Sequence, residues 1–243
     1  MQATEQNNIT LPLHNWEAVH QLEREKNYLS NVAAGIGAAS IASGALLGSP
    51  AFLLLALAYD PLDRVKKLAR LLKVMFALLE NFEHLGVQVF PTLKVPEKKN
   101  PIDLFVRFPR KAHIIISIRS KGESEIVYNE AKEALYVKRG KKGLKDWQPC
   151  PLVELGDYTN WLTKNRQLFG MSSKEVRNVP LSKVLVVWNP TKISTHREHL
   201  YSTIESLKLL VLKRKGTAFV IPDEDIINFV RAYLAHYEAQ KEA

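Results

Sequence analysis

The sequence predicts an α/β protein with a mixed β-sheet flanked by helices, preceded by an apolar N-terminal helix or helical hairpin of membrane type. Apolar residues recur at helical spacing between residues 60 and 86 and then give way to short apolar strands. Helix-like and strand-like segments alternate from there to the C-terminus, which is typical of an α/β domain. A run without charged residues, from 27 to 59, predicts the N-terminal segment.

The charge of the chain is unevenly distributed. Among its 243 residues, 34 are Lys or Arg and 25 are Asp or Glu, which gives a net charge of +9. Residues 1–59 contain four acidic and only two basic side chains, so the excess of positive charge lies in residues 60–243. This basic body favours an anionic partner, either nucleic acid or an anionic bilayer. The single Cys150 excludes an intramolecular disulfide and is typical of a reducing compartment.

The uncharged run predicts a membrane-inserted segment, because residues 32–58 could cross a bilayer with some tilt. We expect one helix kinked at Pro50, and a helical hairpin or a buried hairpin in a soluble domain remain alternatives. Lys and Arg residues directly after the run predict that the C-terminal body is cytoplasmic. Small residues would let a helix of a protein partner approach closely: Gly35, Ala39, Ser43 and Gly44.

The remaining elements form one basic α/β domain, residues 60–243, that follows the N-terminal region 1–59. Asp60 as N-cap and Pro61 at the first helical position predict a helix that ends at Gly86. The predicted strands are 87–90, 102–108, 114–119, a weaker one at 125–128 or 134–137, 183–189, and a hairpin within 208–221. Helices are predicted at 157–170 and from Asp223 to the C-terminus, with Asp223 as the cap.

The stretch PIDLFVRFPRKAHIIISIRSKG, residues 101–122, contains the most suggestive pattern for chemistry. Asp103 opens a strand that is entered through a proline, and the next strand ends at Ser117-Ile118-Arg119. Alternation along that strand places Ser117 and Arg119 on the same face. The preceding helix carries Glu80 near its end.

This arrangement resembles the PD-(D/E)xK nuclease superfamily over residues 60–234, most closely the NERD-like and restriction-endonuclease-like domains. The resemblance implies that Asp103 holds a divalent metal, Mg²⁺, with Glu80 as an additional carboxylate. It also implies that Ser117 and Arg119 occupy the places of the family's acidic residue and lysine. The family is a group of metal-dependent phosphodiesterases, so an active form of this chain would be a nuclease.

The site departs from the family pattern, because Ser117 supplies no negative charge to hold a hydrated Mg²⁺. We therefore expect a degenerate catalytic site, unless Glu123 or Glu125 supplies the missing carboxylate. Arg119 could still contact a phosphate through two N–H groups. The alternative is an ordinary core hairpin in which Asp103 is a charge at the strand edge.

A second basic segment, VKRGKKGLKDW, predicts a phosphate-binding loop with Trp147 available for stacking on a base. A solvated hairpin tip is the alternative. The predicted nucleic-acid-binding residues are Lys121, Lys138, Arg139, Lys141, Lys142 and Lys145.

Two functions are consistent with these features. The first is a membrane-associated, nuclease-like protein that binds nucleic acid through its basic face and has a degenerate catalytic site. The second is a non-enzymatic, membrane-anchored interaction module whose basic surface binds anionic lipid or a partner protein. No cofactor is expected beyond Mg²⁺, and that only in an active form.

Overall fold

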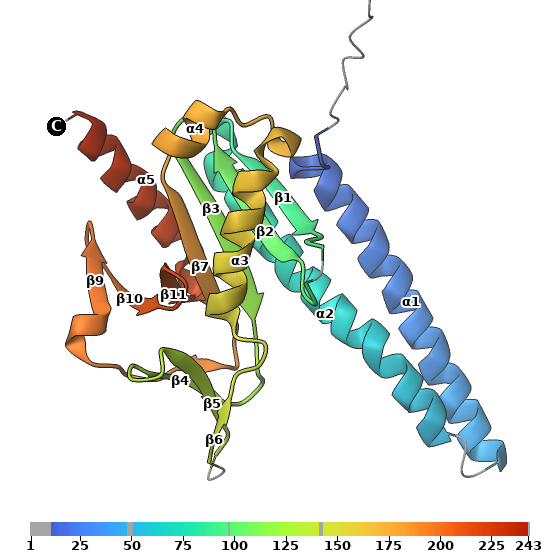
Figure 1. Cartoon of the computed structure of the whole chain (residues 1–243). Coiled ribbons are helices and arrows are strands. Elements are labelled where there is room, and N and C mark those ends of the chain that lie inside the picture. Colours follow the sequence, from blue (N-terminus) through green and yellow to red (C-terminus); the bar gives the residue numbers. More distant parts are fainter. Residues whose placement is uncertain (1–10, 48–50, 97, 141–142, 243) are drawn as a thin grey trace, which may run out of the picture.

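The computed structural model describes residues 11–47, 51–96, 98–140 and 143–242, and only the backbone within 37–59 and 240–242. Its helices and strands are arranged as in Figure 1. The helices are α1 (Asn15–Leu47), α2 (Ala51–Phe82), α3 (Pro151–Lys164), α4 (Ser173–Asn178) and α5 (Ile226–Glu242). The strands are β1 (Gln88–Leu93), β2 (Ile102–Phe108), β3 (Ala112–Arg119), β4 (Glu125–Asn129), β5 (Ala134–Lys138), β6 (Leu144–Asp146), β7 (Leu181–Val187), β8 (Lys192–Ile193), β9 (Tyr201–Ile204), β10 (Leu207–Lys213) and β11 (Thr217–Pro222).

The main sheet has the strand order β1-β2-β3-β7-β11-β10-β9. Neighbouring strands pair antiparallel from β1 to β3 and from β11 to β9. At the centre of the sheet, β7 pairs in parallel with both β3 and β11. Helix α3 packs on one face, and α2, α5 and the start of α1 pack on the other. The prediction of an α/β fold with a mixed sheet flanked by helices is therefore confirmed.

Strand β3 is buried on both faces, which explains its almost continuous apolar sequence. Ile114 and Ile116 pack in the core under α2 and α5, while Ile115 packs in the core under α3. The two faces of the sheet are therefore both closed, and polar side chains of β3 can reach solvent only near its ends.

A second, smaller sheet has the strand order β6-β5-β4-β8. It is built from the β4–β5–β6 meander, and β8 adds to β4 in parallel. Both of the weaker strands considered from the sequence are therefore present. The small sheet lies beyond the carboxyl ends of β3 and β7 (Figure 1). Its strands line some of the hollows described below.

Helix α2 begins at Ala51 and continues through Pro61, so the predicted helix start at Asp60 was wrong. A proline removes one N–H donor from a helix, but its φ angle is compatible with helical geometry. The sequence on both sides is rich in Leu and Ala, which favour a helix strongly enough to continue past the proline. The expected division between residues 59 and 60 falls inside α2.

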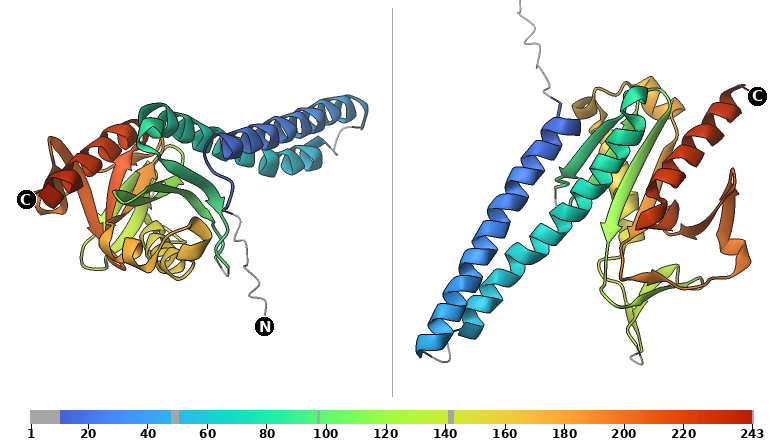
Figure 2. Two further views of the ribbon diagram at one scale, coloured as in Figure 1. Left: turned by 90° about the horizontal axis from the view of Figure 1, so that it is seen from above. Right: turned by 180° about the vertical axis from the view of Figure 1, so that it is seen from behind.

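Helices α1 and α2 run antiparallel and extend together beyond the sheet (Figure 2). Trp16 Nε1 donates to Glu83 Oε1 at 2.8 Å near one end, and Arg64 Nε donates to Glu25 Oε1 at 2.9 Å further along. Val19, on α1, is completely buried in the core of the sheet. The start of α1 is therefore part of the folded body.

The expected single helix kinked at Pro50 is not observed. The backbone forms two helices, one ending at Leu47 and one beginning at Ala51, which is the helical-hairpin alternative. No helix in the part of the chain that the structure describes has an apolar stretch long enough to cross a bilayer. The side chains of 37–59, on which that prediction mainly depended, and Pro50 itself lie outside the described residues.

A buried ion pair joins α4 to the sheet at the end opposite to Asp103. Arg107 Nε and Nη2 donate to the two carboxylate oxygens of Glu175, both at 2.9 Å, and Nη1 donates to Gln88 Oε1 at 2.8 Å. His113, which is 2% exposed, has its Nε2 3.2 Å from Glu175 Oε1. Burial lowers the pKa of His113, although Glu175 opposes that effect.

We expect His113 to make stability depend on pH. Because its pKa is lower in the folded state, the unfolded chain binds the proton more strongly, so stability falls as the pH drops below the unfolded value of about 6.5. His113→Gln should therefore lose less of its free energy of unfolding between pH 7.5 and pH 5 than the parent, measured by urea unfolding. His84→Gln, at an exposed position, should follow the parent. Equal pH dependence in the parent and His113→Gln would contradict this account.

Candidate functional site: a basic groove at the carboxyl edge of the sheet

The carboxyl ends of the three parallel strands β3, β7 and β11 meet at one edge of the main sheet. Strand β3 ends at Arg119, β7 at Val187 and β11 at Pro222. Open α/β sheets usually bind their ligands at this edge. A basic groove and a separate hollow that contains Asp223 and Glu224 are found there.

Asp103 lies under the basic hollow and is 1% exposed. Its Oδ2 accepts a hydrogen bond from the backbone N–H of Ile118 at 2.8 Å and another from Arg119 Nη1. Lys67, from α2, places its Nζ 2.9 Å from Oδ1, and this contact is ionic without hydrogen-bond geometry. Both oxygens of Asp103 are therefore held by cations.

Arg119 is the centre of a buried charge network. Its Nη2 lies 3.4 Å from Glu154 Oε2, and Glu154 Oε1 accepts a hydrogen bond from Asn100 Nδ2 at 2.7 Å. Burial alone would lower the pKa of Arg119, but the nearby Asp103 and Glu154 carboxylates outweigh it and raise the pKa. Two carboxylates thus face two cations, Lys67 and Arg119, so the buried charges balance.

Tyr158, from α3, supports this network from behind. Its hydroxyl donates to the backbone carbonyl of Asn100 at 2.9 Å. Burial, followed by the negative charge of Glu154, raises the pKa of Tyr158 well above its usual value. Tyr158 therefore remains a neutral donor and fixes the segment that carries Asn100.

The structure brings together Asp103, Ser117 and Arg119, but not Glu80, the fourth residue implied by the nuclease resemblance. The β2–β3 register, in which Leu104 pairs with Ile116, places Ser117 opposite Asp103, and Ser117 is completely buried with no hydrogen-bond partner for its hydroxyl among the described residues. Glu80 is exposed on α2, thirteen residues beyond Lys67 in the sequence. That separation corresponds to about 20 Å along a helix, so Glu80 does not approach Asp103.

The residues present do not fit a Mg²⁺ ion. Mg²⁺ needs oxygen ligands that are free to coordinate it, usually including one or two carboxylates. Asp103 is already held by Lys67 and Arg119, and Glu154 is held by Arg119 and Asn100. Among the described residues, no group of three His, Cys, Asp or Glu side chains lies close enough together to hold a metal.

Above the network lies the basic groove, which consists of two adjoining hollows. The inner hollow, of about 320 Å³, contains Asp63 as its only carboxylate together with five cations. The outer hollow, of about 560 Å³, shares Lys121, Trp147 and Gln148 with the inner one and contains Asp146 as its only carboxylate. The cations of the basic groove are Lys67, Arg70, Lys99, Arg119, Lys121, Arg139 and Lys145.

The basic groove contains only part of the predicted nucleic-acid-binding set. Lys121, Arg139 and Lys145 line it. Lys138 lies in a different hollow, where its Nζ is 4.0 Å from Glu125. The other two predicted residues, Lys141 and Lys142, lie outside the described residues.

Trp147 was expected to be available for stacking, and this prediction was wrong. Its side chain is 2% exposed and belongs to the core under α3, and the ammonium of Lys121 lies 5.4 Å from the centroid of its ring. The ring of Trp147 therefore lies beneath the ammonium group of Lys121. Burial lowers the pKa of Lys121, and the neighbouring Arg119, Arg139 and Lys145 lower it further. An anion in the groove would relieve this repulsion.

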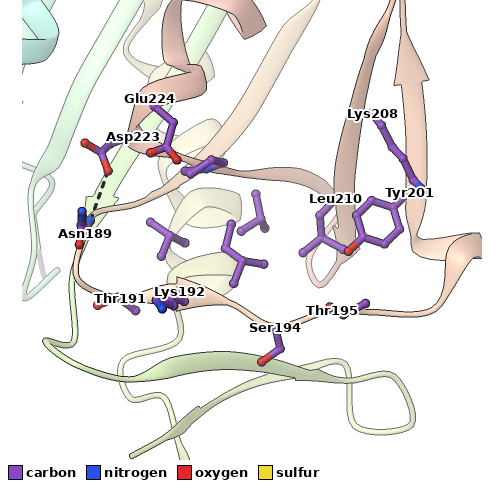
Figure 3. Close-up of a pocket in the computed structure, with 14 residues that line it drawn as sticks. Asn189, Thr191, Lys192, Ser194, Thr195, Tyr201, Lys208, Leu210, Asp223 and Glu224 are labelled. Atoms are coloured by element: carbon purple, nitrogen blue, oxygen red, sulfur yellow. Dashed lines mark hydrogen bonds between the residues drawn. The ribbon is translucent and has the colours of Figure 1, made fainter.

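The second hollow, of about 530 Å³, lies between β8 and the ends of β7, β10 and β11 (Figure 3). Asp223 and Glu224 lie at its rim, and Asp223 accepts a hydrogen bond from the backbone N–H of Asn189 at 3.2 Å. A short 3₁₀ turn precedes α5, and this turn has no side-chain cap, so the prediction of Asp223 as the helix cap was wrong. This hollow shares no lining residue with the basic groove.

The chain was compared with family models, curated proteins and solved structures, and none of the three comparisons gave a match.

Proposed function

We propose that the chain binds nucleic acid through the basic groove and does not cleave it. The observation that carries this proposal is the presence of three cations, Arg70, Lys99 and Lys121, that line the groove without a carboxylate within ion-pair distance among the described residues. The charges below them are balanced by Asp103 and Glu154, so these three supply unneutralised positive charge at the surface. Such charge binds phosphates by releasing their counterions.

We also propose that the domain is a degenerate relative of the PD-(D/E)xK nucleases. The element order supports this: helix α2, the antiparallel strands β1, β2 and β3, helix α3, and the strand β7 parallel to β3. Asp103 and Arg119 at neighbouring strand ends support it as well. Lys67 and Arg119 neutralise the aspartate that the resemblance assigns to the metal, which is the physical reason to expect binding without cleavage.

We expect no Mg²⁺- or Mn²⁺-dependent cleavage by the chain. The assay measures nicking of supercoiled DNA, and cutting of single-stranded DNA and RNA, with either metal and with EDTA. The parent and Asp103→Asn should both leave the substrates intact, because neither offers a free carboxylate pair to a metal. Cleavage by the parent that disappears in Asp103→Asn would show an active metal site. It would contradict the proposal that the chain does not cleave nucleic acid.

A second candidate is an interaction module attached to a membrane by the α1–α2 hairpin. The observation that favours it is the extension of both helices away from the sheet, together with the uncharged sequence between residues 27 and 59 (Figure 2). The basic groove would then face anionic headgroups or a partner protein. Both candidates use the basic groove, but only the second needs the α1–α2 hairpin to enter a bilayer, so membrane attachment can be tested separately.

If the hairpin enters a bilayer, the full chain should float with vesicles of neutral phosphatidylcholine in a density gradient. A charge in this run is costly in hydrocarbon, so a Leu54→Glu, Leu55→Glu double variant should stay at the bottom of the gradient. Flotation only with anionic phosphatidylglycerol vesicles, lost in high salt, would point to the basic surface instead. A parent that does not float with either vesicle would exclude membrane attachment under these conditions.

A further inference from the structure

We propose that the inner hollow of the basic groove is a socket for the terminal phosphate monoester of a nucleic acid strand. This inference rests on the proposed nucleic-acid binding and specifies which part of the strand is recognised. Two observations carry it: the concentration of positive charge in the inner hollow, and the presence of α2 along the inner hollow but not along the outer one.

The inner hollow concentrates its positive charge in less space than the outer one. Of the five cations that line it, Lys67 and Arg119 are balanced by Asp103 and Glu154. The other three lie with one carboxylate around about 320 Å³, whereas three cations and one carboxylate line about 560 Å³ in the outer hollow. A phosphodiester inside a strand carries one negative charge, but a terminal monoester carries about 1.5 to 2 at neutral pH, together with three acceptor oxygens. The inner hollow therefore matches the group with the larger charge.

Helix α2 lines the inner hollow and not the outer one. Asp63, Lys67, Arg70 and Leu71 line the inner hollow from this helix, and no residue of α2 lines the outer hollow. The two hollows join at Lys121, which lies at the end of β3. A strand whose end occupies the inner hollow therefore continues past Lys121 toward Arg139 and Lys145 on the small sheet.

Two inner cations are available to hold the phosphate. Arg70 has its guanidinium carbon 5.9 Å from the ring centroid of Trp188, which orients the side chain without neutralising it. Lys99, on the loop before β2, is exposed and lines the same hollow. A guanidinium can bind two phosphate oxygens at once, and an ammonium can reach the third. By contrast, Arg119 is held below by Asp103 and Glu154.

The test uses the full chain and one internally labelled oligonucleotide in three forms: with a 5′-phosphate, with a 3′-phosphate, and with hydroxyl groups at both ends. Affinity is measured by fluorescence anisotropy in EDTA at fixed salt. One phosphorylated form should bind about tenfold more tightly than the hydroxyl form, since hydrogen bonds to charged groups typically contribute this much. A hydroxyl-ended probe one nucleotide longer controls for the added charge and should show no such gain.

The position of the phosphate site is tested with Arg70→Gln and Lys99→Gln. In each variant, the preferred phosphorylated probe should bind about as tightly as the hydroxyl probe, so that the ratio of these two affinities is close to one. Lys66→Gln, an exposed neighbour on the same helix that does not line the groove, should keep the full preference. Equal binding of all three probes overturns the socket and leaves the proposed function intact. A preference that survives in both variants also overturns it. Failure of every probe to bind overturns the socket and the proposed function together.

Discussion

Replacing Asp103 by alanine is expected to lower the free energy of unfolding by about 3–5 kcal/mol, the usual cost of removing one partner from a buried ion pair. Asp103 is 1% exposed and holds Arg119, Lys67 and the backbone N–H of Ile118. Without it, Arg119 keeps only Glu154 as a charged partner in a site with little access to water. Urea unfolding followed by circular dichroism measures the change.

The control is Glu238→Ala, which removes a carboxylate from the exposed Lys111–Glu238 pair and should cost less than about 1 kcal/mol. The double variant Asp103→Ala, Arg119→Met should recover part of the lost stability, because it removes the unpaired charge together with its partner. If Asp103→Ala costs no more than Glu238→Ala, Asp103 does not stabilise a buried charge network. The account of the site would then be wrong.

Replacing Lys121, Arg139 and Lys145 together by glutamine is expected to weaken binding to every nucleic acid sequence. These three cations line the outer hollow, where the strand would continue. Each phosphate contact that is lost should reduce the slope of log affinity against log salt by about 0.7–0.9, so the slope should fall by about two to three. The measurement is anisotropy of labelled single-stranded and duplex probes at several salt concentrations.

A matched triple variant replaces Lys66, Lys94 and Lys174 by glutamine. All three are exposed, none lines the groove, and the change in net charge is the same. This control should bind nearly as well as the parent. If both triple variants weaken binding equally, the net charge of the chain, and not the groove, attracts the nucleic acid.

The central strands could be predicted from the sequence because they are short, strongly apolar and separated by turn residues. The predicted segment 102–108 coincides with β2, and 183–189 is shifted by two residues from β7. The start of α2 could not be predicted. Asp60-Pro61 is a strong local signal for a helix start, but the helix-forming residues on both sides override it. Local signals are weakest where a neighbouring segment continues the same structure.

The candidate site could be predicted only in part from the sequence, for a related reason. Alternation along the strand placed Ser117 and Arg119 on one face, and the resemblance to the nuclease superfamily associated Asp103 with them. The charged partners of Asp103 and Arg119 that come from α2 and α3 depend on how these helices cross the sheet, and no local sequence pattern encodes that. The sequence therefore suggested Glu80 as the neighbour of Asp103 on α2, whereas the structure places Lys67 there. Glu154 and Lys99 were not identified as site residues.

The most direct test of the central claim is the affinity of the full chain for a labelled oligonucleotide, measured in EDTA and then in Mg²⁺ over a range of salt concentrations. Because Lys67 and Arg119 neutralise Asp103, binding should need no metal, and log affinity in EDTA should fall linearly with log salt. Mg²⁺ should act only as a competing cation and weaken binding. Binding that requires Mg²⁺, or that does not change with salt, would contradict a metal-free basic groove.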